Sequence, residues 1–289
     1  MICNVCPRKC NVDRNRKLGF CKASENLKIA KYMLHFWEEP IISGDKGSGA
    51  IFFSHCNLKC VYCQNSQIST EGLGKYVSIQ ELVDIMKQLE KMGANNINLV
   101  TPTQYTDQIM QALTIYRPKV PIVWNSSGYE SVETLQKLAG FVDVYLVDMK
   151  YMDEELAFNL SRAKDYPEVC QKAILQMRKN QPKDIIQDGI MKKGVIVRHL
   201  VIPNEVENSF KVLNWISENL GKDCFISIMS QYTPCYLAKN MEKYNRALKP
   251  IEYKRVLHKM DELGFCTGFV QELDSSSTTY IPNFDKFND

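Results

Sequence analysis

The sequence predicts an α/β protein built as a partial (β/α)6 TIM-like barrel with a small Cys-rich metal-binding extension at its N-terminus. From about residue 49 onward, short apolar runs alternate with amphipathic helical patterns, as in a parallel sheet whose strands are joined by helices. The 289 residues, 45% apolar and 24% charged, suffice for a sizeable buried core. Cysteines cluster before and just inside this region, at 3, 6, 10 and 21 and at 56, 60 and 63.

Six apolar, β-prone segments are the predicted strands of the barrel. Their near-continuous hydrophobicity indicates burial on both faces of the sheet. They span residues 50–54, 96–101, 120–126, 142–149, 194–202 and 224–230.

The predicted helices carry start and stop signals. Ser78 and Glu81 form a capping box before an apolar stripe that ends near Gly93. Segments 209–220 and 251–263 have the same helical spacing of apolar residues. The polar, helix-prone stretch 151–190 is long for a simple connection, so we expect an elaborated crossover. We therefore divide the chain into an N-terminal Cys-rich segment (1–48), the barrel (49–273) and a loosely held C-terminal tail (274–289).

Composition and charge exclude several classes of protein. The net charge, 36 − 33 = +3, is too small to favour nucleic acid or an anionic membrane as a partner. No apolar run approaches the ~18 residues of a membrane span, and the first residues do not resemble a signal peptide. We therefore expect a cytoplasmic protein, where reducing conditions disfavour disulfides and leave metal or iron–sulfur ligation to explain the clustered cysteines. The four scattered cysteines are expected to be ordinary core residues: Cys170, Cys224, Cys235 and Cys266.

Cys56, Cys60 and Cys63 place three thiolates within eight residues at the end of the first predicted strand. A structural zinc site takes four protein ligands, whereas a 4Fe-4S cluster held by three cysteines leaves one iron open for another molecule. The cluster is therefore favoured over zinc completed by His55 or a distant cysteine.

Polar residues follow the later strands, where barrels of this kind place their functional groups. Arg198 and His199 are adjacent in the fifth strand, so at most one faces the lumen, and Arg198 is our candidate. The candidates are Thr101 and Thr103 after the second strand, Asn125 and Ser127 at the third, Asp148 and Lys150 at the fourth, Arg198 in the fifth and Gln231 after the sixth.

The three-cysteine loop, with residues 47–53 before it and Gln64 and Asn65 after it, resembles the signature of the radical S-adenosylmethionine superfamily. The branch that it resembles is that of the pyruvate formate-lyase activating enzymes, and the resemblance covers residues 3 to about 272. It implies that the three cysteines bind three irons of a 4Fe-4S cluster and that S-adenosylmethionine chelates the fourth. Reductive cleavage then yields a 5′-deoxyadenosyl radical, which abstracts hydrogen from a substrate.

The resemblance also implies cofactor contacts for the strand-end residues. It places Tyr62 near the adenine, although an aromatic residue that packs the loop is an equal alternative, and it makes Asn65 a candidate cofactor-binding residue. Thr101 and Thr103 stand where the superfamily has a Gly-Gly-Glu element, so the carboxylate for the methionine amino group is missing. Asn125 and Ser127 are expected to bind the ribose or the methionine carboxylate, or alternatively only to form a turn. Asp148 and Lys150 are expected near the cofactor or substrate, or alternatively only as an ion pair. Gln231 is expected at the substrate end.

Cys3, Cys6, Cys10 and Cys21 supply four thiolates within nineteen residues, too few for a hydrophobic core without a metal. Four closed ligands favour zinc, with an auxiliary iron–sulfur cluster and unligated thiols as alternatives. The basic residues nearby are expected to be solvated surface charge rather than a site for RNA or an acidic partner: Arg8, Lys9, Arg14, Arg16 and Lys17.

The sequence thus predicts a radical enzyme acting on a protein or peptide, including the installation of a glycyl radical on a partner enzyme. Gln64 departs from the His of authentic activating enzymes, which leaves the substrate open. The alternatives are the same chemistry on a small molecule and a non-catalytic metal-binding scaffold. The expected electron donor is a flavodoxin or ferredoxin.

Overall fold

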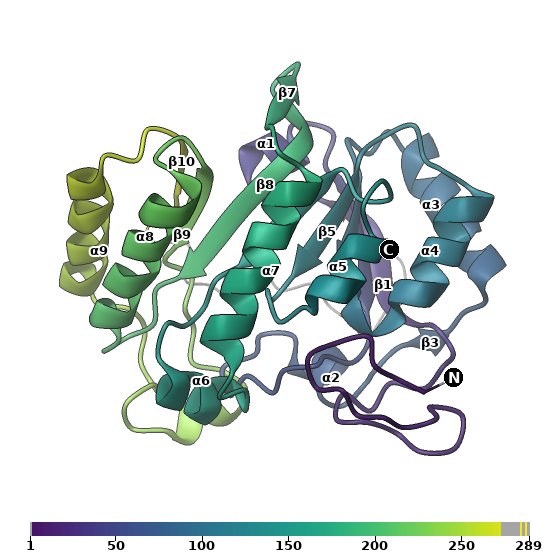
Figure 1. The fold of residues 1–289 in the computed structure, drawn as a ribbon, viewed down its shortest axis with the longest axis horizontal. Coiled ribbons are helices and arrows are strands. Elements are labelled where there is room, and N and C mark those ends of the chain that lie inside the picture. Colours follow the sequence, from purple (N-terminus) through teal and green to yellow (C-terminus); the bar gives the residue numbers. More distant parts are fainter. Residues whose placement is uncertain (1, 273–283, 285–286, 288–289) are drawn as a thin grey trace.

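A computed structural model describes residues 2–272, Phe284 and Phe287. Within this part of the chain ten strands form one sheet, in which β10, β9, β8, β6, β5, β4, β2, β1 and β3 lie side by side (Figure 1). The strands from β2 to β10 along this path are parallel, whereas β1 and β3 pair antiparallel at one edge and β7 forms a hairpin with β8. Their bounds are β1 Lys28–His35, β2 Ser48–Phe53, β3 Lys75–Tyr76, β4 Ile97–Val100, β5 Ile122–Ser126, β6 Val144–Asp148, β7 Ile185–Gln187, β8 Ile190–Leu200, β9 Phe225–Met229 and β10 Gly268–Val270.

The six strands predicted from the sequence correspond to β2, β4, β5, β6, β8 and β9. β8 begins four residues earlier than expected, at Ile190, because its first residues pair with β7. β1 was not expected, and it lies inside the segment 1–48 while pairing with β2 from Ile29 to His35. The part of that segment outside the sheet therefore consists of residues 2–27 and the link 36–47.

Helices α3, α4, α5, α7 and α8 cover one face of the sheet, as Figure 1 shows. Ser78 caps α3 with the expected capping box, and Gly264, at φ 71°, ends α9. The stretch 151–190 is the expected elaborated crossover, with two helices and the hairpin strand β7 between β6 and β8. The helices are α1 Pro40–Ser43, α2 Ser66–Ser69, α3 Ile79–Lys91, α4 Thr106–Ile115, α5 Val132–Lys137, α6 Glu154–Ser161, α7 Tyr166–Asn180, α8 Val206–Leu220 and α9 Pro250–Leu263, with 3-10 turns at Thr103–Tyr105 and Tyr236–Asn240.

Alternate residues of the strands face the helices or the concave side of the sheet, which we call the lumen. The helix side holds the largest core cluster, which includes Ile51, Leu99 and Trp124. At the amino ends of the strands, Ile42 of α1 closes the lumen by packing on an apolar cluster: Val123, Val144, Leu146, Met191 and Ile196. Residues further along the same strands are polar, so the lumen changes from an apolar floor to a polar chamber near the carboxyl ends.

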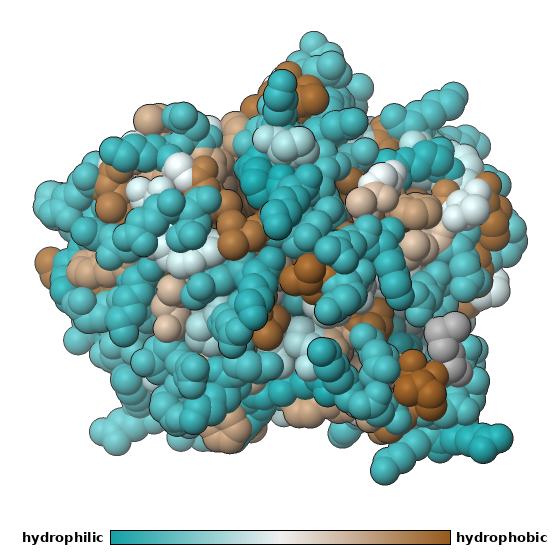
Figure 2. All heavy atoms as spheres, viewed as in Figure 1, coloured by the Kyte–Doolittle hydropathy of each residue, from teal (hydrophilic) through white to brown (hydrophobic). Residues whose placement is uncertain are grey.

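Two further features concern the surface and the ends of the described chain. Figure 2 shows a helix-covered face that is mostly hydrophilic, with hydrophobic atoms at the tip of the protruding β7 hairpin, where Ile185 and Ile186 are exposed. Phe284 is buried against Phe52, with ring centroids 5.6 Å apart, whereas most of the expected tail 274–289 lies outside the described residues.

Within the described chain, no helix is both long enough and apolar enough to cross a bilayer.

Candidate functional site

The three-cysteine loop follows β2 at the carboxyl edge of the sheet and is anchored on both sides. Its backbone N–H groups at Lys59 and Val61 donate to the carbonyls of Ser161 and Leu160, at 3.1 and 2.8 Å, where α6 ends. The Val61 carbonyl accepts from Ala238, at 2.9 Å. The loop is therefore held by elements distant in sequence rather than by its own turn alone.

The thiols of this loop sit among hydrogen-bond donors. Ser161 Oγ donates to Cys60 Sγ at 3.0 Å, Ser69 Oγ lies 3.2 Å from Cys63 Sγ, and the Leu58 N–H donates to Cys56 Sγ at 3.4 Å. These donors suit sulfurs that carry negative charge.

Burial disfavours the thiolate form in the loop. It raises the pKa of Cys56 to about 12, with Cys60 adding to the shift, and that of Cys60 to about 11, against the opposing effect of Lys150. Three ionised thiolates here therefore require positive charge from a bound group. Among the described residues no three His, Cys, Asp or Glu side chains are close enough to hold a single ion. A cubane cluster takes its thiolates on different irons, so the donor set fits a cluster better than one metal ion.

A cavity of about 200 Å³ lies beside the loop. It brings together many of the residues that the sequence predicts for the site: Cys60, Tyr62, Cys63, Asn65, Asp148, Lys150, Arg198 and Gln231. These residues come from the loop and from β6, β8 and the end of β9, so the carboxyl edge of the parallel sheet gathers them as expected for this fold.

Tyr62 is buried at the cavity wall. Its hydroxyl lies 2.5 Å from that of Tyr151, which in turn lies 2.7 Å from Ser161 Oγ, and its ring packs on Tyr232 with centroids 5.6 Å apart. A chain of hydroxyls thus runs from Tyr62 to the serine that donates to Cys60.

The centre of the lumen is a network of buried charges around Arg198. The guanidinium donates to Asp148 at 2.8 Å, Glu38 at 3.1 Å and Asn125 at 2.7 Å, and Lys150 donates to Asp148 at 2.6 Å. For Asp148, burial acts to raise the carboxyl pKa, but Arg198 and Lys150 outweigh it and lower the pKa. For Lys150, Asp148 outweighs burial and raises the amine pKa. His199, on the opposite face of β8, is buried, with Met149 O at 2.7 Å and Ser209 Oγ at 2.8 Å from its ring nitrogens.

Other predicted site residues do not line this cavity. Thr103 donates to the buried carboxyl of Glu130 at 2.6 Å, and Thr101, at φ 58°, accepts from the side chain of Gln104. Asn125 reaches the lumen but is occupied by Glu38 and Arg198, and Ser127 accepts through its carbonyl from Tyr166.

Sequence reasoning missed two lumen carboxyls, Glu38 and Glu39. Glu38 accepts from Asn98 and Asn125, both at 3.0 Å, as well as from Arg198. Both glutamates lie in the link between β1 and α1, which passes through the lumen. The one local signal was a pair of glutamates between Trp37 and Pro40, at the start of a helix that the sequence did not predict.

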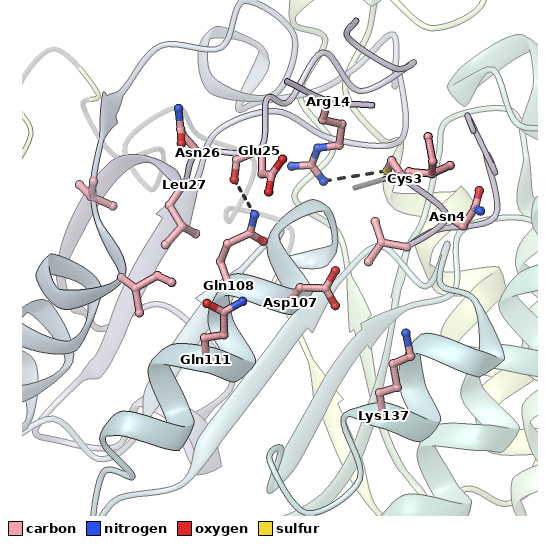
Figure 3. Close-up of a pocket in the computed structure, with 14 residues that line it drawn as sticks. Cys3, Asn4, Arg14, Glu25, Asn26, Leu27, Asp107, Gln108, Gln111 and Lys137 are labelled. Carbon is pink, nitrogen blue, oxygen red and sulfur yellow. Dashed lines mark hydrogen bonds between the residues drawn. The ribbon is translucent and has the colours of Figure 1, made fainter. Parts of the chain in front are cut away.

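The N-terminal segment docks on the outside of the same carboxyl edge. Arg14 is buried rather than solvated, and its guanidinium donates to the Gln104 carbonyl at 2.6 Å and lies 4.0 Å from Cys3 Sγ (Figure 3). Around it is a cavity of about 370 Å³, in which Gln108 of α4 donates to the Glu25 carbonyl. The expectation of a solvated Arg14 is therefore wrong, because the segment packs against the barrel.

This segment also contacts the three-cysteine loop directly. Arg8 Nε donates to the Asn57 carbonyl at 3.0 Å, and its guanidinium stacks on Phe20 at 3.8 Å. Arg8 Nη2 and Lys59 Nζ are buried without a hydrogen-bond partner in the described part of the chain. The pKa of Lys59 is lowered chiefly by burial, while Cys56 and Cys21, one from each cysteine group, act in the opposite direction.

The four N-terminal thiols are neighbours. Burial raises the pKa of Cys6 to about 12, and both Cys21 and Cys3 add to the shift, while Cys10 acts in the same way on Cys21. In the described part of the chain, these thiols are not close enough to one another to hold a single metal ion. All eleven cysteines are free thiols. Among the scattered ones, Cys170 and Cys224 are buried as expected, whereas Cys266 is exposed and Cys235 is only partly buried, donating to the Tyr62 carbonyl at 3.2 Å.

Comparison with known proteins places this site in a family. Residues 50–214 match the model of the Radical SAM superfamily, and the chain belongs to this superfamily. Membership implies a 4Fe-4S cluster, S-adenosylmethionine and enzymatic radical chemistry. The chain is 33% identical to the uncharacterized protein MJ0674 of Methanocaldococcus jannaschii over 265 residues, which are 88% of this chain and 73% of that protein.

Solved structures share the fold at low sequence identity. Streptococcus suis SuiB has a TM-score of 0.53 and 13% identity, over 76% of this chain and 47% of SuiB. SuiB bound to S-adenosylmethionine has a TM-score of 0.51 and 14% identity, over 75% of this chain and 48% of that one. This likeness confirms the partial TIM-like barrel, and the chain spans about half the length of SuiB.

Proposed function

We propose that this chain is an enzyme that cleaves S-adenosylmethionine at a 4Fe-4S cluster held by Cys56, Cys60 and Cys63, and that its substrate is a protein or peptide. The observation that carries the proposal is the three-cysteine loop at the carboxyl end of β2, facing a cavity lined by Asp148 and Lys150. When bound, the cluster and S-adenosylmethionine supply one-electron cleavage of the sulfonium and a 5′-deoxyadenosyl radical that takes hydrogen from the substrate.

The residues of the chain have binding and shielding roles in this proposal. Lys150 offers a cation to the methionine carboxylate, and Tyr62 packs near the adenine. Gln231 and Asn65 supply further polar contacts from the cavity wall. The proposal also assigns Asn125 and Ser127 to the ribose, and Thr101 and Thr103 to the methionine amino group. Asn125 and Thr103 would have to exchange their present side-chain partners for these contacts.

Water must be kept from such a reaction, since it would compete for every polar contact around the cofactor. Tyr62, Tyr151, Tyr166 and Tyr232 are buried beside the loop and would shield that side of the cavity from water. The network of Arg198, Asp148 and Lys150 holds its charges in place without needing solvent.

We also propose a metal at Cys3, Cys6, Cys10 and Cys21, either zinc or an auxiliary cluster. The support is the closeness of the four thiols and the N–H groups of Phe20 and Ala23, which donate to Cys10 and Cys21 at 3.4 and 3.5 Å. Two buried nitrogen atoms without a hydrogen-bond partner in the described chain, Arg8 Nη2 and Lys59 Nζ, favour negative charge nearby, which thiolates bound to a metal would supply.

Among radical S-adenosylmethionine enzymes, we propose that the chain belongs to the branch of the pyruvate formate-lyase activating enzymes. Its reaction would then include the installation of a glycyl radical on a partner enzyme. The N-terminal module, the barrel and the C-terminal segment would act as one enzyme, reduced by a flavodoxin or ferredoxin in the cytoplasm. The cysteines of the described chain form no disulfide, which favours such a reducing compartment.

The test is made on anaerobically reconstituted, reduced protein, by measuring iron, sulfide, zinc and the 5′-deoxyadenosine released from S-adenosylmethionine. About four irons, one zinc and release of 5′-deoxyadenosine support one cluster and a zinc module, whereas about eight irons without zinc make the module an auxiliary cluster. Cys60→Ala should abolish the release and keep the N-terminal metal. Cys266→Ala, at an exposed cysteine, is the matched control. Full cleavage by Cys60→Ala would contradict the assignment of the loop.

A further inference from the structure

A second lumen cavity, of about 400 Å³, adjoins the one beside the three-cysteine loop. Arg198, Met229 and Gln231 line both cavities, so they are neighbours across a shared wall. The far side of the second cavity is formed by residues 37–40 and by β10. A molecule held there would lie beside whatever occupies the first cavity.

The charges of this second cavity do not balance. Among its described lining residues, Glu38, Glu39 and Arg198 are charged, which gives two carboxyls to one guanidinium. Arg198 donates to Glu38, and the other acceptors of its guanidinium are Asp148 and Asn125. No hydrogen bond in the described chain joins Arg198 to Glu39, but the charge of the guanidinium acts on this carboxyl as well, so one cation serves three carboxyls: Asp148, Glu38 and Glu39.

Glu39 is built into the wall rather than extended into solvent. The residue is 8% exposed, and its Oε2 atom has no hydrogen-bond partner among the described residues. Burial raises the pKa of this carboxyl, Arg198 opposes the shift and Glu38 adds to it. Glu39 thus has no cation beyond its share of Arg198, and a ligand that brought one would relieve the cost of ionising it.

The other walls suit an organic cation. Trp37 and Phe269 contribute aromatic rings to the same cavity, and Pro40 and Met229 contribute apolar surface. A carboxylate combined with aromatic and apolar walls accommodates an ammonium or guanidinium group on an alkyl stem, since both the charge and the stem find partners.

The cavity also borders an edge of the sheet. β10 is the terminal strand, paired with β9 alone in the described part of the chain, and Val270 is 47% exposed. An extended peptide can add to such an edge through main-chain hydrogen bonds, with alternate side chains directed into neighbouring pockets. This favours a peptide over a free amine as the source of the cation.

We propose that this cavity is a specificity subsite for a lysine or arginine side chain of an extended peptide substrate, with Glu39 as the partner of the cation. The inference rests on the proposed function, because the subsite would position the same peptide from which hydrogen is taken. Its chemistry, an ammonium or guanidinium on a flexible stem, is nevertheless testable by binding alone.

The experiment is titration calorimetry on the full-length, cluster-reconstituted protein. The probes are blocked tripeptides with lysine, arginine or norleucine between two glycines, together with butylammonium as a free amine. We expect the lysine and arginine peptides to bind, and Glu39→Gln to weaken them roughly tenfold to hundredfold, the range for a hydrogen bond to a charged group. Glu133→Gln, at an exposed glutamate of α5, should change nothing.

The outcomes separate this inference from the function on which it rests. Equal binding of the lysine and norleucine peptides by the wild-type chain would overturn the subsite without relying on any variant, as would unchanged affinity in a folded Glu39→Gln protein. Butylammonium binding as tightly as the lysine peptide would overturn the peptide assignment in favour of small amines. Release of 5′-deoxyadenosine is measured separately on the wild-type protein. If peptide binding depends on Glu39 but no 5′-deoxyadenosine is released, the proposed function is refuted and the subsite stands.

Discussion

Removing Arg198 should be among the most costly single substitutions in this chain. Its side chain is 13% exposed, and it links Glu38, 11% exposed, and Asp148, 16% exposed, across the lumen. In Arg198→Met, Asp148 keeps Lys150, but Glu38 keeps only the amide donors of Asn98 and Asn125 and no cation. Breaking a buried ion pair in this way typically costs about 3–5 kcal/mol, because a desolvated charge loses its partner.

The assay is urea unfolding of the cluster-free protein at pH 7.5, followed by circular dichroism and fluorescence to check that the two probes agree. Arg117→Met is the matched control: Arg117 pairs with Asp143 at 2.5 Å but is 39% exposed, so we expect a loss of at most about 1 kcal/mol. Glu38→Gln added to Arg198→Met should recover part of the loss, since it removes the orphaned charge. A loss for Arg198→Met no larger than that of the control would refute the account of the lumen as a charge network.

Three further predictions concern pH and backbone geometry. Burial raises the pKa of Glu130 to about 7, so the native state holds a proton that the unfolded chain releases, and wild-type stability should fall by up to about 3 kcal/mol as pH rises from 4.5 to 7. Thermal melts across this range should show that Glu130→Gln lacks this loss. Burial lowers the pKa of His199 to about 4, which gives the opposite sign: stability should fall as pH drops from 6.5 toward 4, and melts of His199→Gln should lose that component. Gly128 has φ 76°, and a Cβ at this position would lie 2.5 Å from the Asp148 carbonyl, so urea unfolding should show that Gly128→Ala loses more than about 2 kcal/mol of stability. The control is Gly140→Ala, at φ 84° with open space around it, which should lose about 1 kcal/mol. Equal losses for the two variants would contradict the steric argument.

Features encoded in short stretches of sequence could be predicted. The capping box of α3 depends on Ser78 and Glu81, three residues apart, and the three thiols of the loop lie within eight residues. Asp148 and Lys150 could be placed at the cavity because the carboxyl ends of parallel strands share one edge of the sheet, whatever the details of packing.

Features that depend on the path of connecting segments could not be predicted from the sequence. β1 was missed because it carries lysines, among them the buried Lys31, and follows a segment dominated by cysteines. Thr103 and Arg14 were assigned from their position in the sequence, but their partners, Glu130 and the Gln104 carbonyl, lie far along the chain. The sequence offers no local signal for such pairs.

By itself the sequence determined the alternation of strands and helices, the loop that defines the family and the residues at the strand ends, because each follows from near-neighbour spacing and periodicity. Only the tertiary structure decided that the link between β1 and α1 crosses the lumen, carrying Glu38 to Arg198 and leaving Glu39 Oε2 without a hydrogen-bond partner among the described residues. It also decided that the N-terminal segment packs on the cysteine loop through Arg8. The physical reason is that burial and charge pairing are set by which surfaces meet, and those surfaces come from residues 49 to 160 positions apart in the chain.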